Sequence, residues 1–170
     1  MLSSEPALPV PGKKIASPDA TFVAFLRHSG DLPWGTPYTS LSLDGLPFGA
    51  RRFGWNAVWS PCSRFFAISE WGYAQEDERP DSYLVLIDVS RRRQCFIERV
   101  ERGCIDPVFI NDGLLKYSMM LPAVMERAVG YQNVNDITSW HPVSHNLPQN
   151  EFLDIGCSFA SDLPTKGSVR

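Results

Sequence analysis

The sequence predicts a mainly β fold made of stacked antiparallel sheets, and three observations support this prediction. Residues 17–26 resemble residues 60–69, which lie 43 positions later, and residues 38–44 resemble residues 82–88. Repeats of about 40–50 residues are typical of stacked β units. Aromatic residues make up 12% of the chain, which favours strands, and the 14 Pro and 12 Gly indicate many turns.

The length and net charge of the chain limit the number of domains and the classes of partner that we expect. Its 170 residues are enough for one domain. Lys and Arg number 16 against 19 Asp and Glu, a formal net charge of −3, so nucleic acid is not an expected partner. No apolar run reaches the ~18 residues of a membrane span. The first residues also lack a signal-peptide pattern, so we expect no membrane association and a cytoplasmic location.

The four cysteines show no C-x-x-C pair and no dense framework; they are Cys62, Cys95, Cys104 and Cys157. This spacing favours reduced thiols in a reducing compartment over a secreted disulfide scaffold. A bridge between Cys95 and Cys104 stays open as an alternative.

Local patterns predict the first elements in order. Residues 1–16 are rich in Ser, Pro and small side chains, and we expect a flexible arm. Ser17-Pro18 and Ser60-Pro61 each start a turn, and Asp44-Gly45 predicts a hairpin. The expected strands are rich in aromatic and aliphatic residues; they are residues 21–26, 38–43, 65–71, 83–89 and 94–100.

The later part of the chain gives weaker signals. Residues 83–89 are almost entirely apolar, as in a strand that is covered on both faces. A third unit is expected at 108–117, and residues 119–129 are compatible with one short helix, which Pro122 limits. Residues 152–159 predict a last strand.

We therefore expect one β-rich domain over residues 17–160. A frayed tail is expected at 161–170.

Ser-Pro-Asp-x-x-Phe-Val-Ala-Phe, then a loop and a strand ending in an aliphatic–Asp pair, resembles blades of the WD40-like and TolB-like β-propeller families. Residues 17–44 and 60–88 carry this resemblance, with residues 108–117 as a degenerate third copy. Propellers usually close with 4–8 blades, whereas this chain has room for about three. The resemblance implies an open, propeller-like stack of antiparallel sheets or a derived β-sandwich, and a second copy would be needed for closure.

Motifs for catalysis or metal binding are weak. His141 and His145 have a spacing that occurs in zinc sites, but no Cys-x-x-Cys pair accompanies them and Pro142 interrupts a helix there. We expect no metal, no cofactor and no catalytic residue. Carboxylates near predicted strand ends leave a small hydrolase as an alternative; the candidates are Asp31, Glu70 and Asp106.

The most distinctive segment, residues 70–78, is both acidic and aromatic. Trp and Tyr are enriched at interface hot spots, and clustered carboxylates attract basic partners. A turn-rich loop at 30–38 carries one more Trp. The expected partner-binding residues are Trp34, Glu70, Trp71, Tyr73, Glu76, Asp77, Glu78 and Asp81.

These features predict a protein-binding module that acts by occlusion. Bacterial immunity and antitoxin proteins are alike in size, acidity and lack of catalytic motifs, so a cognate toxin with a basic domain is the expected partner. A carboxylate-dependent hydrolase and a self-associating scaffold subunit are the alternatives.

Overall fold

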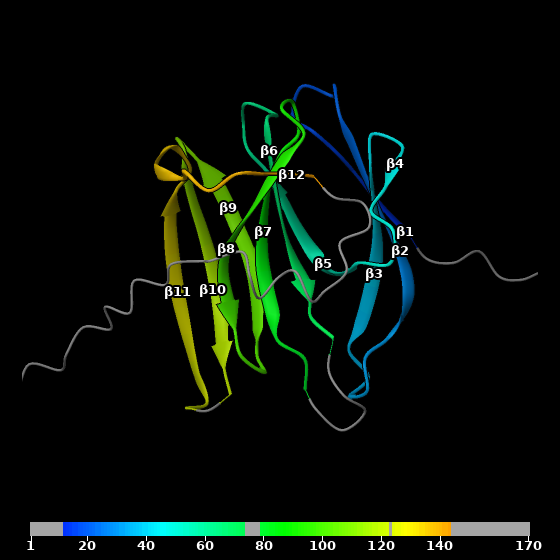
Figure 1. Ribbon diagram of the computed structural model, residues 1–170, viewed down its shortest axis with the longest axis vertical. Coiled ribbons are helices and arrows are strands. Elements are labelled where there is room, and N and C mark those ends of the chain that lie inside the picture. The colour runs from blue at the N-terminus through cyan, green and yellow to red at the C-terminus, as the bar shows by residue number, and fades with distance from the viewer. Residues whose placement is uncertain (1–11, 74–78, 123, 144–170) are drawn as a thin grey trace, which may run out of the picture.

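Antiparallel strands dominate the computed structural model, which describes residues 12–73, 79–122 and 124–143 (Figure 1). The predicted mainly β class is therefore confirmed. In chain order the elements are β1 (Gly12–Ala16), β2 (Val23–Asp31), β3 (Pro37–Leu43), β4 (Leu46–Pro47), β5 (Arg52–Trp59), β6 (Phe65–Trp71), β7 (Ser82–Asp88), β8 (Arg93–Val100), β9 (Cys104–Asn111), β10 (Leu114–Leu121), β11 (Glu126–Asn133), the 3-10 turn η1 (Val134–Asp136) and β12 (His141–Pro142).

The strands form two sheets, neither of which closes into a barrel within the described residues. The larger sheet has the order β1-β2-β3-β5-β6-β7-β8-β12, with β4 beside β3, and the smaller has the order β11-β10-β9. β3 and β5 are joined at a single pair, Thr39 with Phe53. Figure 1 accordingly shows three groups of strands side by side, which we call the first unit (β1–β4), the second unit (β5–β8) and the third unit (β9–β11).

The repeated Ser-Pro segments fold into the same turn, so the repeat seen in the sequence is a structural repeat. In the first copy the N–H of Ser17 donates to the carbonyl of Phe22 at 2.8 Å, and the N–H of Phe22 donates to Ser17 Oγ at 3.0 Å. In the second copy, Ser60 and Phe65 make the same two bonds at 2.8 and 2.9 Å. Each turn leads into the second strand of its unit.

Two apolar clusters hold the units together, one on each face of the second unit. Alternate side chains of β6 and β7 point to opposite faces. Towards the first unit, the buried cluster contains Ala24, Leu26, Leu41, Leu43, Phe48, Phe53, Phe66, Ile68, Val85, Ile87 and Val89. Towards the third unit, it contains Ala67, Leu84, Leu86, Cys95, Val100, Ile105, Ile110, Leu115, Tyr117 and Val134. The continuous apolar run predicted at 83–89 is therefore a strand covered on both faces.

The predicted flexible arm over residues 1–16 needs a correction at its end. Residues 12–16 form β1, which pairs antiparallel with β2 from Gly12 opposite Arg27 to Ala16 opposite Val23. The sequence hides this strand because only Ile15 packs against the core, while Lys13 and Lys14 are exposed. Residues 1–11 lie outside the described part of the chain.

The short helix predicted at residues 119–129 is wrong. The end of β10, a turn and the start of β11 occupy this range, and Met119 stands opposite Ala128 in the hairpin. The helical spacing of Met120, Val124 and Ala128 is accidental, because Val124 lies in the exposed turn. The predicted strand at 152–159 and the tail at 161–170 lie outside the described residues.

Candidate functional site

One end of the molecule carries a cation that contacts two aromatic rings. We call it the loop end, because the β2–β3 connection, the start of β5 and the end of β6 lie there (Figure 1). The guanidinium carbon of Arg52, the first residue of β5, lies 5.3 Å from the ring centroid of Tyr38 and 4.2 Å from that of Tyr73. The Tyr73 hydroxyl donates to the carbonyl of Ala50 at 3.3 Å. Two cation–π contacts restrict the orientation of the guanidinium.

Trp34 adds a second exposed aromatic side chain to the loop end. It sits in the tight turn between β2 and β3, where the N–H of Leu32 donates to the carbonyl of Thr36 at 2.8 Å. Leu32 is buried and anchors the turn, whereas the Trp34 side chain is 48% exposed and Tyr73 is 51% exposed. Trp34, Tyr38, Arg52 and Tyr73 together form what we call the aromatic–arginine surface.

Asp81, another predicted contact residue, closes the β6–β7 connection. Its carboxylate accepts from Arg99 Nε at 2.9 Å and from the N–H of Arg102 at 2.9 Å. Its carbonyl accepts from the N–H of Gly72 at 2.8 Å. Asp81 therefore positions this end of the second unit. Glu76, Asp77 and Glu78 lie outside the described residues.

Glu70 and Trp71 were predicted to contact a partner, but the structure places both inside. Glu70 is 2% exposed and accepts from Arg51 Nε at 2.8 Å and from Arg51 Nη2 at 2.6 Å. Arg51 Nη1 donates to Gln94 Oε1 at 2.8 Å. Trp71 is buried, and its indole N–H has no hydrogen-bond partner among the residues that the structure describes.

The Arg51–Glu70 pair is a structural element of the interface between the first and second units. The guanidinium carbon of Arg51 lies 5.4 Å from the Phe48 ring centroid and 5.0 Å from that of Phe53. A charge in such surroundings is tolerated only when it is paired and hydrogen-bonded. One sequence signal could have revealed the burial of Glu70. In β6 all the other residues are apolar, apart from one small Ser.

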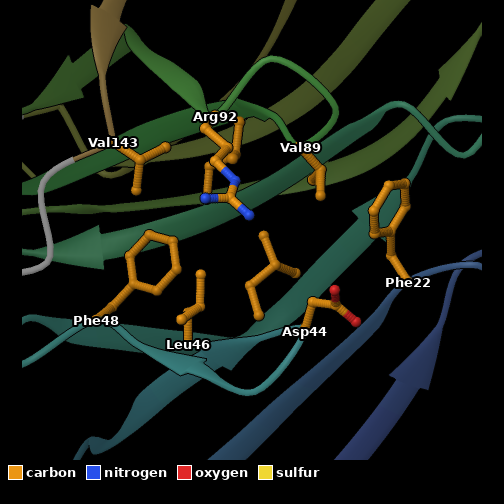
Figure 2. A pocket seen from close by; sticks show the side chains of 9 residues that line it. Phe22, Asp44, Leu46, Phe48, Val89, Arg92 and Val143 are labelled. Carbon is orange, nitrogen blue, oxygen red and sulfur yellow. The ribbon is translucent and has the colours of Figure 1, made fainter.

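A cleft lies between the first and second units, at the end opposite the loop end (Figure 2). Its volume is about 150 Å³, which is small beside the ~300–1,000 Å³ of sites for drug-sized ligands. Figure 2 shows Arg92 reaching into the cleft from the β7–β8 turn, with Asp44 on the opposite wall. The remaining lining is apolar: Phe22, Leu43, Leu46, Phe48, Ile87, Val89 and Val143.

The structure does not bring together the carboxylates proposed for a hydrolase. Asp31 ends β2 in the first unit and contacts His28 at 3.3 Å, whereas Asp106 belongs to β9 in the third unit. Glu70 is engaged by Arg51 between the first and second units. The second unit separates Asp31 from Asp106, so these two carboxylates do not form a catalytic pair.

The two histidines with zinc-site spacing do not belong to a metal-binding cluster among the described residues. His141 starts β12 and stands opposite Gln94, and His145 lies outside the described residues. In the ranges that the structure describes, no three His, Cys, Asp or Glu side chains are arranged to hold a metal ion.

The cysteines differ in environment. Cys95 is buried, Cys104 is half-buried, and the two do not form the bridge that the sequence left open. Cys62 is exposed and occupies, in the second Ser-Pro turn, the position that Asp19 holds in the first. The Ser60 hydroxyl, 3.3 Å from Cys62 Sγ, lowers the pKa of this thiol, and the N–H and charge of Arg64 act in the same direction. Burial and the charge of Asp106 raise the pKa of Cys104.

We expect iodoacetamide to alkylate Cys62 much faster than Cys104 near neutral pH. The thiolate is the nucleophile, and a lowered pKa enlarges its fraction while exposure gives access. Peptide-resolved mass spectrometry over a pH series measures both rates, and Ser60→Ala should move the Cys62 profile to higher pH. Equal rates for the two thiols, or an unchanged profile in Ser60→Ala, would contradict the assignment.

Comparisons with protein-family models, with curated proteins and with solved structures find no match for this chain. Among the described residues, no helix is long and apolar enough to cross a membrane. The sequence pointed to Trp34 and Tyr73 by residue, and to Tyr38 only as the end of the 30–38 loop. Arg52 was missed, because its contacts with the two rings are tertiary.

Proposed function

We propose that this chain is a protein-binding module that neutralises its partner by covering it with the loop end. A bacterial immunity or antitoxin protein that inhibits a cognate toxin fits this description best. The observation that carries the proposal is the contact of the Arg52 guanidinium with both Tyr38 and Tyr73, with Trp34 exposed at the same end. Trp, Tyr and Arg are the residues that dominate interface hot spots.

Preorganisation supports this assignment. Binding normally costs side-chain entropy for each flexible residue that becomes ordered. Arg52 is already stacked, and Tyr73 is already hydrogen-bonded to Ala50, so both present their surfaces without further ordering. The exposed faces of Trp34 and Tyr73 supply apolar area that a partner can bury.

Charge indicates the chemistry of the partner. Residues 76–78 are all acidic in the sequence, they follow Tyr73 closely, and the chain has a net charge of −3. Acidic residues at the rim of an interface accelerate association with a basic protein. We therefore propose a basic partner, such as the catalytic domain of a toxin that acts on nucleic acid.

We also propose that the three units are an open, propeller-like stack rather than a derived β-sandwich. A sandwich has two layers, whereas here the second unit is covered on both faces by separate clusters. The repeated turns at Ser17 and Ser60 support equivalent units. In such a stack the connections gather at the ends, which suits binding there.

The test uses the full chain and the product of the gene beside its own, with calorimetric titration to measure Kd. Tyr73→Ala and Trp34→Ala should each weaken binding at least tenfold, about 1.4 kcal/mol or more. Phe25→Ala is the matched control, because Phe25 is a 38% exposed aromatic residue in β2, away from the loop end, and it should leave Kd unchanged.

Two outcomes would overturn the proposal: no complex with the neighbouring gene product, or equal effects of Tyr73→Ala and the control on Kd.

Replacing Glu76, Asp77 and Glu78 with Lys tests separately whether the partner is basic. The association rate should then fall and lose its salt dependence. An unchanged rate would exclude the acidic segment from the encounter.

A further inference from the structure

The strands that end a sheet differ in how well they are protected against pairing with another chain. Exposed edges are usually blunted by Lys, Pro, bulges or short length. Among the described strands at the ends of the sheets, β1 carries Lys13 and Lys14, and β9 carries Pro107 beside a register shift. β4 and β12 have two residues each and contain Pro47 and Pro142.

β11 has none of these devices. It is eight residues long, contains no Pro and no Lys, and pairs with β10 without a register shift from Glu126 to Asn133. Its two charged residues, Glu126 and Arg127, lie at the beginning beside the turn. Within the part of the chain that the structure describes, β10 is its sole neighbour in the sheet. Of the described strands, none pairs with its other edge.

We propose that β11 pairs antiparallel with β11 of a second copy, so that two third units form one continuous six-stranded sheet. Such an interface is isologous, as in most two-fold dimers. Side chains opposite each other must lie on the same face, so residues of the same parity pair across the axis. A two-fold axis at Val129 satisfies this rule.

This register gives favourable pairs throughout. Val129 faces Val129 of the second copy. Arg127 faces Tyr131 of the second copy, and Ala128 faces Gly130 of the second copy. Cross-strand pairs of aliphatic side chains and of Arg with Tyr stabilise a sheet, and no two like charges are opposed. Val129 and Tyr131 are 54% and 56% exposed in the single chain, so both have surface to bury.

The surroundings of β11 favour a rigid, apolar edge. The Tyr117 ring lies so close to Gly130 that a Cβ added there would overlap it, so this ring covers the centre of β11. On the other face, Lys116 Nζ lies 5.6 Å from the Phe109 ring centroid and 5.8 Å from that of Tyr131. The edge is thus supported on both faces before any second strand arrives.

Light scattering after size exclusion tests the proposal on the full chain. We expect the mass to approach twice the 19.1 kDa of one chain as concentration rises. Val129→Lys places two ammonium groups on the axis and should restore the mass of one chain. Val108→Lys is the control, since Val108 is 46% exposed on β9, and its dimer should persist.

Cross-linking fixes the register independently. Val129→Cys should form a disulfide-linked dimer under mild oxidation, because the two Cβ atoms would face each other across the axis. Val108→Cys should not. A mass of one chain at every concentration, or a dimer in which Val129→Cys fails to cross-link, would overturn the proposal. Neither readout involves the loop end, so failure here leaves the proposed function untouched.

Discussion

Replacing Glu70 with Ala is expected to lower the free energy of unfolding by about 3–5 kcal/mol. The change leaves the Arg51 guanidinium, whose side chain is 2% exposed, without the carboxylate that it contacts at 2.6 and 2.8 Å. Water cannot replace the carboxylate at this depth. Urea denaturation of both proteins, followed by tryptophan fluorescence, measures the difference.

Two further variants make this prediction specific. Asp81→Ala removes the partly exposed ion pair with Arg99 and the hydrogen bond from the Arg102 N–H. It should lower the free energy of unfolding far less, by on the order of 1 kcal/mol for both interactions together. Arg51→Leu combined with Glu70→Leu should be more stable than Glu70→Ala, since it leaves no unpaired buried charge. If the double variant is the least stable of the three, the cost of Glu70→Ala does not come from an uncompensated charge.

Phe66→Ala is expected to have the second large effect. It should also lower the free energy of unfolding by about 3–5 kcal/mol. Phe66 is fully buried in β6, where it packs in the cluster between the first and second units, with its ring centroid 4.8 Å from that of Trp59. Truncation removes apolar contacts and leaves a cavity between two units whose strands are fixed by their hydrogen bonds. Thermal unfolding by circular dichroism measures the loss.

Phe25→Ala is the matched control for this variant. The same side chain is removed from the neighbouring unit, but Phe25 is 38% exposed in β2, so the loss should be well under half that of Phe66→Ala. Comparable losses at the two positions would mean that the cluster at Phe66 is not the main link between the units.

The sequence allowed the strands with a strong apolar signal to be predicted, and those whose stability comes from pairing alone were missed. β6 and β7 were recognisable because nearly every side chain is buried on one face or the other. β1 was missed because its hydrogen bonds to β2, rather than a hydrophobic pattern, hold Lys13 and Lys14 in place. In the β10–β11 hairpin, apolar residues at a spacing of four fell by chance on opposite sides of a turn.

The candidate site could be predicted only in part, for a similar reason. Trp34 and Tyr73 lie in loops rich in turn residues, so their exposure could be anticipated. Glu70 was expected at the surface because a carboxylate is seldom buried, and its partner Arg51 is 19 residues away in the chain. Arg52 gave no signal at all, since its environment is created by two rings from separate segments, Tyr38 in β3 and Tyr73 after the end of β6.

The covering of the second unit on both faces restricts how this protein can change over time. The apolar side chains at positions 65–68 of β6 and 84–87 of β7 meet one cluster or the other, so a polar replacement at these positions has no solvent to face. The outer faces of the first and third units have no such restriction. Sequence divergence among descendants of this chain should therefore concentrate at the two outer units, with the middle of the chain changing most slowly.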